Sequence, residues 1–158
     1  MKFELIRSSH SVGETNLHLQ LTPAYRQKVF EDELVRILCR DYMLDAANRH
    51  RLTIAAMGFG KEHCHLFITN WKNFSVAKIA QLVKGRTSRM LRKHHAKLFA
   101  DKLWGKKFWS GGYFYRTVGA VNSETVKKYV EESQQKHWIK TEPERKTNPQ
   151  KKLISFGC

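Results

Sequence analysis

Short stretches in which apolar residues alternate with polar ones, or follow one another without interruption, predict the strands of a sheet. Residues 16–22 alternate as in a half-buried strand, which Pro23 ends. Residues 52–57 and 63–69 predict a second and a third strand, and the short turn between them favours an antiparallel hairpin. Residues 113–118 predict a further strand.

Elsewhere, apolar residues recur every three or four positions, which is the period of an amphipathic helix. Residues 28–49 predict one long helix. Ser75 is a suitable N-cap for a second helix that continues to about His94, and a third is expected over 122–137. The order of these elements predicts an α+β fold, in which a single-domain antiparallel sheet with packed helices has a ferredoxin-like or RNA-recognition-like layout.

This domain is expected to occupy residues 1–138. Residues 139–158 are polar and basic and contain two prolines, so we expect a flexible C-terminal tail. The composition is compatible with an arm that contacts nucleic acid or a partner, and equally with a solvated segment that has no such role.

The charge of the chain indicates the kind of partner. Of its 158 residues, 29 are Lys or Arg and 14 are Asp or Glu, which gives a formal net charge of +15. The positive charge is clustered, because residues 84–107 hold nine Lys or Arg and Asp101 is the one acid among them. Clustered positive charge favours a polyanionic partner over solubility alone as its explanation.

The cysteines and the apolar runs indicate the compartment. Cys39, Cys64 and Cys158 are widely spaced, so they predict neither a zinc ribbon nor a disulfide framework and suit a reducing environment. The N-terminal residues lack the apolar core of a signal peptide, and no run approaches the length of a membrane span. We therefore expect a cytoplasmic protein with no membrane partner.

The most informative chemistry lies at His63-Cys64-His65. Side chains alternate between the two faces of a strand, so both imidazoles are expected on one face and the thiol on the other. Two neighbouring neutral imidazoles can share a divalent cation. The alternative is a pair of half-buried histidines that bind no metal.

Several blocks of the sequence resemble the TnpA-type single-tyrosine HUH transposases of the insertion sequence 200/605 group, and they follow one another in the same order as in that family. The resemblance covers roughly residues 9–135. Besides His63-Cys64-His65, the matching blocks are Ser9–Val12, Leu21–Arg26, Leu103-Trp104, Phe108–Phe114 and Asn122–Glu131.

The resemblance implies a DNA transposase that cleaves and rejoins single-stranded DNA. Tyr129 would attack a phosphodiester and hold the DNA as a 5′-phosphotyrosine. His63 and His65 would hold a divalent ion, Mg or Mn, that neutralises charge at the phosphoryl group. A homodimer that binds DNA hairpins at the ends of the element is also implied. Considered alone, Tyr129 would be interpreted as a core aromatic of an amphipathic helix.

The chain departs from the family at one position. The family places a glutamine four residues after the tyrosine as the third metal ligand, and this chain has Ser133 there. Glu132 and Ser133 lie near the helix face of Tyr129, so either could replace the family's glutamine as the ligand. Alternatively, a local distortion of the helix would turn Gln134 toward that face. The third ligand stays open among these residues, with Glu132 as the first choice.

Contacts to DNA are expected from basic and aromatic side chains. The stacking candidates are Tyr25, Trp104, Phe108 and Trp109, and for each of them, considered alone, a place in the core is favoured over a base platform. The candidates for phosphate contacts are Arg26, Lys84, Arg86, Arg89, Arg92 and Lys93.

Three other functions are compatible with parts of the sequence. A replication initiator or relaxase would use the same chemistry, but the chain is too short to carry a helicase as well. A catalytically decayed protein that only binds DNA hairpins is left open by Ser133. An RNA-binding module would prefer RNA and would not need His63.

Overall fold

A four-stranded antiparallel sheet forms the centre of the protein. The computed structural model describes residues 5–120, 124 and 128. The strand order in the sheet is β4-β5-β3-β6, and every neighbouring pair is antiparallel. The strands are β3 (Asn16–Leu21), β4 (Thr53–Phe59), β5 (Cys64–Thr69) and β6 (Phe114–Val118).

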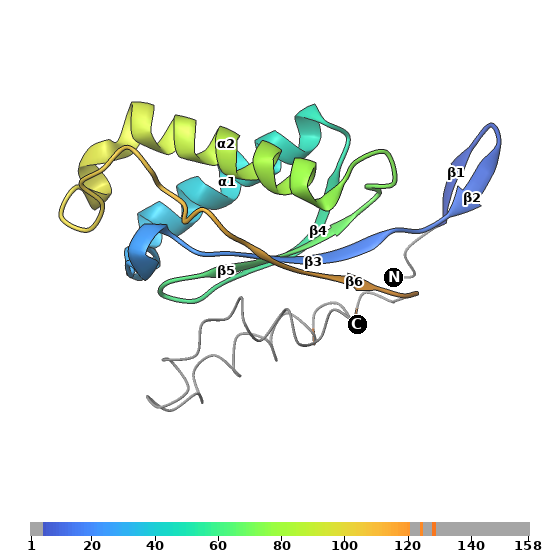
Figure 1. Ribbon diagram of the computed structural model, residues 1–158, viewed down its shortest axis with the longest axis horizontal. Coiled ribbons are helices and arrows are strands. Elements are labelled where there is room, and N and C mark those ends of the chain that lie inside the picture. The colour runs from blue at the N-terminus through green and yellow to red at the C-terminus, as the bar shows by residue number, and fades with distance from the viewer. Residues whose placement is uncertain (1–4, 121–123, 125–127, 129–158) are drawn as a thin grey trace.

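Two helices, α1 (Glu33–Arg49) and α2 (Val76–His95), cover one face of this sheet (Figure 1). The order β3-α1-β4-β5-α2-β6 is the ferredoxin-like arrangement, so the predicted α+β fold is confirmed. A separate small hairpin, β1 (Ile6–Ser8) and β2 (Ser11–Gly13), precedes β3 and was not predicted.

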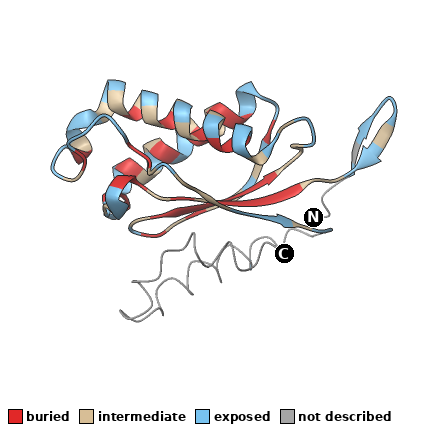
Figure 2. Ribbon diagram, viewed as in Figure 1, coloured by how far each residue is buried: buried red, intermediate tan, exposed pale blue. Residues whose placement is uncertain are grey.

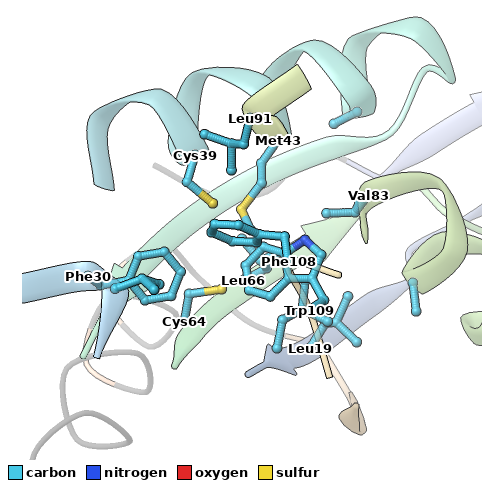
Figure 3. Close-up of a cluster of buried hydrophobic side chains, with 14 of the residues drawn as sticks. Leu19, Phe30, Cys39, Met43, Cys64, Leu66, Val83, Leu91, Phe108 and Trp109 are labelled. Carbon is cyan, nitrogen blue, oxygen red and sulfur yellow. The ribbon is translucent and has the colours of Figure 1, made fainter. Parts of the chain in front are cut away.

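The hydrophobic core lies between the helices and the sheet (Figure 3). Leu19 of β3 pairs with Leu66 of β5, and both are fully buried against α1 residues such as Cys39 and Met43. The residues that alternate with these leucines lie on the opposite face of the sheet. They include His18, which is 3% exposed and therefore also buried.

The first long helix begins later than its apolar pattern predicted. The sequence predicted a helix over 28–49, whereas Val29–Glu31 forms a 3₁₀ turn and α1 starts at Glu33. The Asp32 carboxylate caps the helix by accepting from the backbone N–H of Leu34 at 2.8 Å. Hydrophobic spacing does not distinguish a 3₁₀ turn from the first turn of an α-helix, because both bury residues at similar intervals.

The second helix follows its prediction closely. The hydroxyl oxygen of Ser75 accepts from the backbone N–H of Lys78 at 3.1 Å, so the predicted cap is confirmed. The helix ends at His95 and continues as a 3₁₀ turn, Ala96–Phe99. Of the predicted third helix, the structure describes two residues, Glu124 and Lys128, and both are helical. The predicted tail, 139–158, lies outside the described residues.

Burial follows the sheet and helix faces. The sides of the helices that face the sheet are buried, and their outward sides are exposed (Figure 2). No helix in the described part of the chain is both long enough and apolar enough to cross a membrane.

Candidate active site

Two histidines lie side by side where β5 begins. His63 is the last residue of the turn after β4, one position before β5, and His65 is within the strand. Their ring centroids are 4.9 Å apart and the ring planes cross at 77°. His63 is 5% exposed and His65 is 1% exposed. The pair is thus held in a largely desolvated position where β5 begins.

Gly60 fixes the place of the His63 ring. The backbone N–H of Gly60 donates to the carbonyl of His63 at 2.9 Å, which closes the turn between β4 and β5. The imidazole folds back over Gly60, where a β carbon would lie 2.2 Å from Cε1 of His63. A residue with a side chain cannot stand at position 60 unless the ring moves.

A third imidazole, His18 on β3, adjoins the pair. Its Nε2 lies 2.9 Å from Nδ1 of His65, and the two rings stack with centroids 5.0 Å apart. The sheet register explains the contact, because Gln20 pairs with His65 and His18 is two residues away on the same face. The sequence did not predict a role for His18. The alternation along its strand indicates which face His18 lies on, but not which residue of another strand lies beside it.

The hydrogen bond between these rings constrains the proton positions on His65. If His65 binds a cation through Nε2, its proton is on Nδ1 and is donated to Nε2 of His18. His18 would then have the role of an outer partner that fixes the tautomer and orientation of a metal-binding histidine.

Cys64, between the two histidines, takes no part in the site. It is fully buried on the helix-covered face, opposite the imidazoles. Burial raises the pKa of its thiol far above the ordinary value, so the thiol stays protonated. A protonated thiol is a poor metal ligand.

An ion pair connects the turn at His63 with the turn after β3. Nη2 of Arg26 lies 3.0 Å from Oε1 of Glu62, and the two side chains are 47% and 33% exposed. Arg26 was predicted to contact phosphate, and the structure places it at the edge of the histidine site with an acid as its neighbour.

The other five predicted phosphate contacts lie on α2, and they differ in what they touch. Lys84 Nζ donates to the carbonyl of Ser110 at 2.7 Å, and burial lowers the pKa of its ammonium group. Arg86 Nε lies 2.7 Å from Oδ2 of Asp45 on α1. Both cations therefore make their contacts within the protein and stabilise the fold.

The other three predicted contacts on α2 also differ in whether they bond to the protein or face solvent. Nη1 of Arg92 donates to the carbonyl of Leu103 at 3.0 Å. Arg89 and Lys93 are exposed on the helix surface. These two are the α2 residues of the predicted set that present their charge to solvent.

The structure separates the four aromatic stacking candidates into two pairs. Phe108 is fully buried and Trp109 is 4% exposed, with its indole N–H donating to the hydroxyl of Thr87 at 2.7 Å. Tyr25 and Trp104 are 78% and 75% exposed. The first pair belongs to the core, and the second faces solvent.

Tyr129 and the third-ligand candidates Glu132, Ser133 and Gln134 lie outside the described residues. Within residues 5–120, 124 and 128, no group of three or more His, Cys, Asp or Glu side chains is placed to hold a metal ion. His63 and His65 supply two adjacent nitrogen donors, which suits part of a divalent-cation site. Further ligands would have to come from elsewhere.

Comparison with known proteins identifies the class. The family described as IS200-like transposases matches residues 11–133, which include the whole sheet and the histidine pair. The class is that of the DNA transposases. The chain belongs to the IS200-like transposase family, and the resemblance to the insertion sequence 200/605 group is confirmed.

Solved structures agree with this assignment at the level of the fold. The chain is similar to a candidate transposase from Deinococcus radiodurans R1, with a TM-score of 0.64 and 22% identity over 82% of this chain and 97% of that one. It is also similar to a REP-associated tyrosine transposase bound to a REP hairpin, with a TM-score of 0.52 and 12% identity over 81% of this chain and 68% of that one. No curated protein matches the chain.

Proposed function

We propose that the protein cleaves and rejoins single-stranded DNA at the ends of an insertion sequence, with Tyr129 as the nucleophile. The observation that carries the proposal is the buried pair of imidazoles, His63 and His65, in a chain of the IS200-like transposase family. The family makes DNA the substrate, and a divalent cation held by this pair would neutralise charge at an anionic phosphodiester.

In the proposed reaction, the phenol oxygen of Tyr129 bonds to phosphorus and the bond to the 3′ oxygen breaks. The 3′ oxygen takes up a proton and the 5′ phosphate stays on the tyrosine. A 3′-hydroxyl of another strand end then attacks the phosphotyrosine and restores the phenol. One phosphodiester is broken and one is formed, so no nucleotide cofactor is consumed.

His63 and His65 would hold a divalent ion, Mg or Mn, together with Glu132, or with Ser133 or Gln134 in its place. When bound, the ion would neutralise charge at the phosphoryl group. Gly60 and His18 support this assignment, because one fixes the His63 ring and the other contacts the His65 ring. The residues of the chain thereby orient both donors before DNA arrives.

We further propose that the protein acts in the cytoplasm as a homodimer and binds DNA hairpins. The hairpin proposal is supported by the likeness to a tyrosine transposase that is bound to a REP hairpin. The exposed Arg89 and Lys93, together with Arg26, are the proposed phosphate contacts.

Denaturing electrophoresis tests the proposal. The protein is incubated with a 3′-labelled single strand that spans the end of its own element, with Mg²⁺, Mn²⁺ or EDTA, because the fragment on the 3′ side of the break is the one that stays on the tyrosine. We expect a protein–DNA adduct with metal, its loss in Tyr129→Phe, and its retention in the control Tyr115→Phe. Adducts that persist in Tyr129→Phe would disprove the assignment. Hairpin binding without any adduct would instead favour a catalytically decayed hairpin-binding protein.

A further inference from the structure

Two exposed aromatic rings stand face to face near the histidine site. Tyr25 and Trp104 are 78% and 75% exposed. Their ring centroids are 6.1 Å apart and their planes differ by 9°, so the rings are nearly parallel. Large apolar groups are usually withdrawn from water, and an exposed patch of them marks an interaction site more often than a single exposed residue does.

The backbone holds the Tyr25 ring in an unusual position. Tyr25 has φ 58° and Arg26 has φ 53°, so two consecutive side-chain-bearing residues lie in the left-handed region. Such a conformation persists where the surrounding structure enforces it, and it occurs often in ligand clamps. Here the backbone N–H of Ala24 donates to the carbonyl of Phe108 at 2.9 Å, and Arg26 pairs with Glu62.

The loop that carries Trp104 is fastened on both sides of the indole. Arg92 donates to the carbonyl of Leu103 at 3.0 Å and to that of Lys107, and its guanidinium lies over the Phe99 ring. In addition, Lys102 Nζ donates to the carbonyl of Lys28 at 3.0 Å, which joins this loop to the segment after Tyr25. Figure 1 shows both segments at the same end of the sheet. The two rings are thus presented by anchored backbone.

A cavity of about 240 Å³ is lined by both rings and by the basic loop that follows Trp104. That volume is below the roughly 300–1,000 Å³ of pockets for drug-sized ligands, so the cavity has room only for a smaller group. Lys106 and Lys107 line the cavity and are exposed, and no carboxylate in the described part of the chain forms an ion pair with either. The cavity therefore combines aromatic faces with positive charge.

We propose that Tyr25 and Trp104 form a platform on which one unpaired base of single-stranded DNA stacks, while Lys106 and Lys107 contact the flanking phosphates. This combination of an aromatic face and adjacent cations is how single strands are bound without a requirement for one sequence. The choice of DNA rests on the proposed function. The ion pair between Arg26 and Glu62 connects the platform directly to the turn that carries His63.

The test measures binding in EDTA, so it does not depend on cleavage. Fluorescence anisotropy follows the binding of a fluorescein-labelled dT 20-mer and of an abasic 20-mer that has the same number of phosphates. We expect Trp104→Ala and Tyr25→Ala each to weaken binding of the dT strand about tenfold or more. The variants and the wild type should bind the abasic strand equally well.

Two further variants keep the test decisive. Trp104→Phe retains a ring and should retain most of the affinity, and the control Tyr115→Ala removes another exposed ring, 51% exposed on β6, without loss. Equal loss on dT and abasic strands, or no loss in Trp104→Ala, would overturn the platform. Tighter Trp104-dependent binding of an rU 20-mer would overturn the choice of DNA. If no adduct formed in the electrophoresis assay, the proposed reaction of Tyr129 would be wrong, but the binding measurements would still test the platform.

Discussion

Gly60 and His63 are in such close contact that the glycine determines where the imidazole lies. A β carbon at position 60 would be 2.2 Å from Cε1, 2.6 Å from Nε2 and 2.8 Å from Nδ1 of His63. Because His63 is only 5% exposed, its ring has little room to move aside. The turn between β4 and β5 therefore positions one of the two proposed metal ligands.

The first prediction concerns Gly60→Ala. The added methyl group should displace the His63 ring and cost about 1–3 kcal/mol of unfolding free energy, as overpacking does. We expect adduct formation to fall at least tenfold, because a ligand displaced by about 1 Å loses much of its effect.

Gly85→Ala is the matched control for that change. Gly85 lies within α2 and is exposed. Apart from the adjoining backbone of its own helix, no atom of the described residues would lie within 4 Å of a β carbon at this position. Alanine there should stabilise the helix by up to about 1 kcal/mol and leave adduct formation unchanged. If both glycine variants behaved alike in the adduct assay, Gly60 would have no positioning role.

The second prediction concerns His18→Ala. Removal of the imidazole that contacts His65 at 2.9 Å should lower the affinity for Mn²⁺ about 10- to 100-fold, as the loss of outer-shell partners does. Isothermal titration with Mn²⁺ alone measures this affinity without DNA. The exposed His50 provides a control, His50→Ala, that should bind Mn²⁺ like the wild type. Unchanged Mn²⁺ affinity in His18→Ala would show that His65 is oriented by other means.

The third prediction concerns alkaline pH. Burial raises the pKa of the Cys39 and Cys64 thiols well above 9.0, the value of an unperturbed thiol. Above about pH 9 the unfolded chain releases protons that the folded protein keeps, so the free energy of unfolding falls. Each thiol contributes a slope of up to about 1.4 kcal/mol per pH unit.

Urea denaturation of the wild type and of Cys39→Ala between pH 8 and 10.5 measures that slope. The variant lacks one of the two thiols, so its stability should fall less steeply above pH 9 than that of the wild type. Parallel curves for the two proteins would mean that Cys39 ionises equally well in the folded and unfolded states.

The fourth prediction separates two neighbouring arginines of α2. Arg89 is exposed, so Arg89→Ala should weaken DNA binding and reduce the dependence of log affinity on log salt by about 0.7 for the lost contact with a single strand. Arg86 bonds to Asp45 and lowers the pKa of that carboxyl. Arg86→Ala should therefore cost about 1 kcal/mol or less of stability and leave the salt dependence unchanged. If Arg86→Ala reduced the salt dependence and Arg89→Ala did not, then Arg86 would be the phosphate contact and Arg89 would not.

The fold could be predicted from the sequence because burial and local structure agree in most elements. The alternation of Leu17, Leu19 and Leu21 with polar residues matches the buried face of β3, and Ser75 caps α2 as expected. The start of α1 was predicted too early because Val29 and Phe30 are buried from a 3₁₀ turn. Apolar spacing records burial, and burial does not fix the type of turn.

The candidate site was predicted only in part, because its other members come from different strands. The spacing of His63 and His65 was enough to predict that their side chains point the same way, whereas the place of His18 depends on the register between β3 and β5. Register is a tertiary property that a single strand does not encode. The close contact of Gly60 with His63 depends on the path of the turn, for the same reason.

Charge alone also could not distinguish DNA contacts from structural cations. Lys84, Arg86 and Arg92 make bonds within the protein, whereas Arg89 and Lys93 face solvent. A helix that carries many cations gives the same sequence pattern in both cases.

The covalent bond to DNA is the central claim, and peptide mapping tests it most directly. The adduct formed with Mg²⁺ or Mn²⁺ is digested with a protease and a nuclease, and mass spectrometry locates the residual nucleotide. We predict one nucleotide, joined through its 5′ phosphate to Tyr129. A nucleotide on any other residue, or no adduct at any metal concentration with a single strand from the end of the element, would contradict that claim.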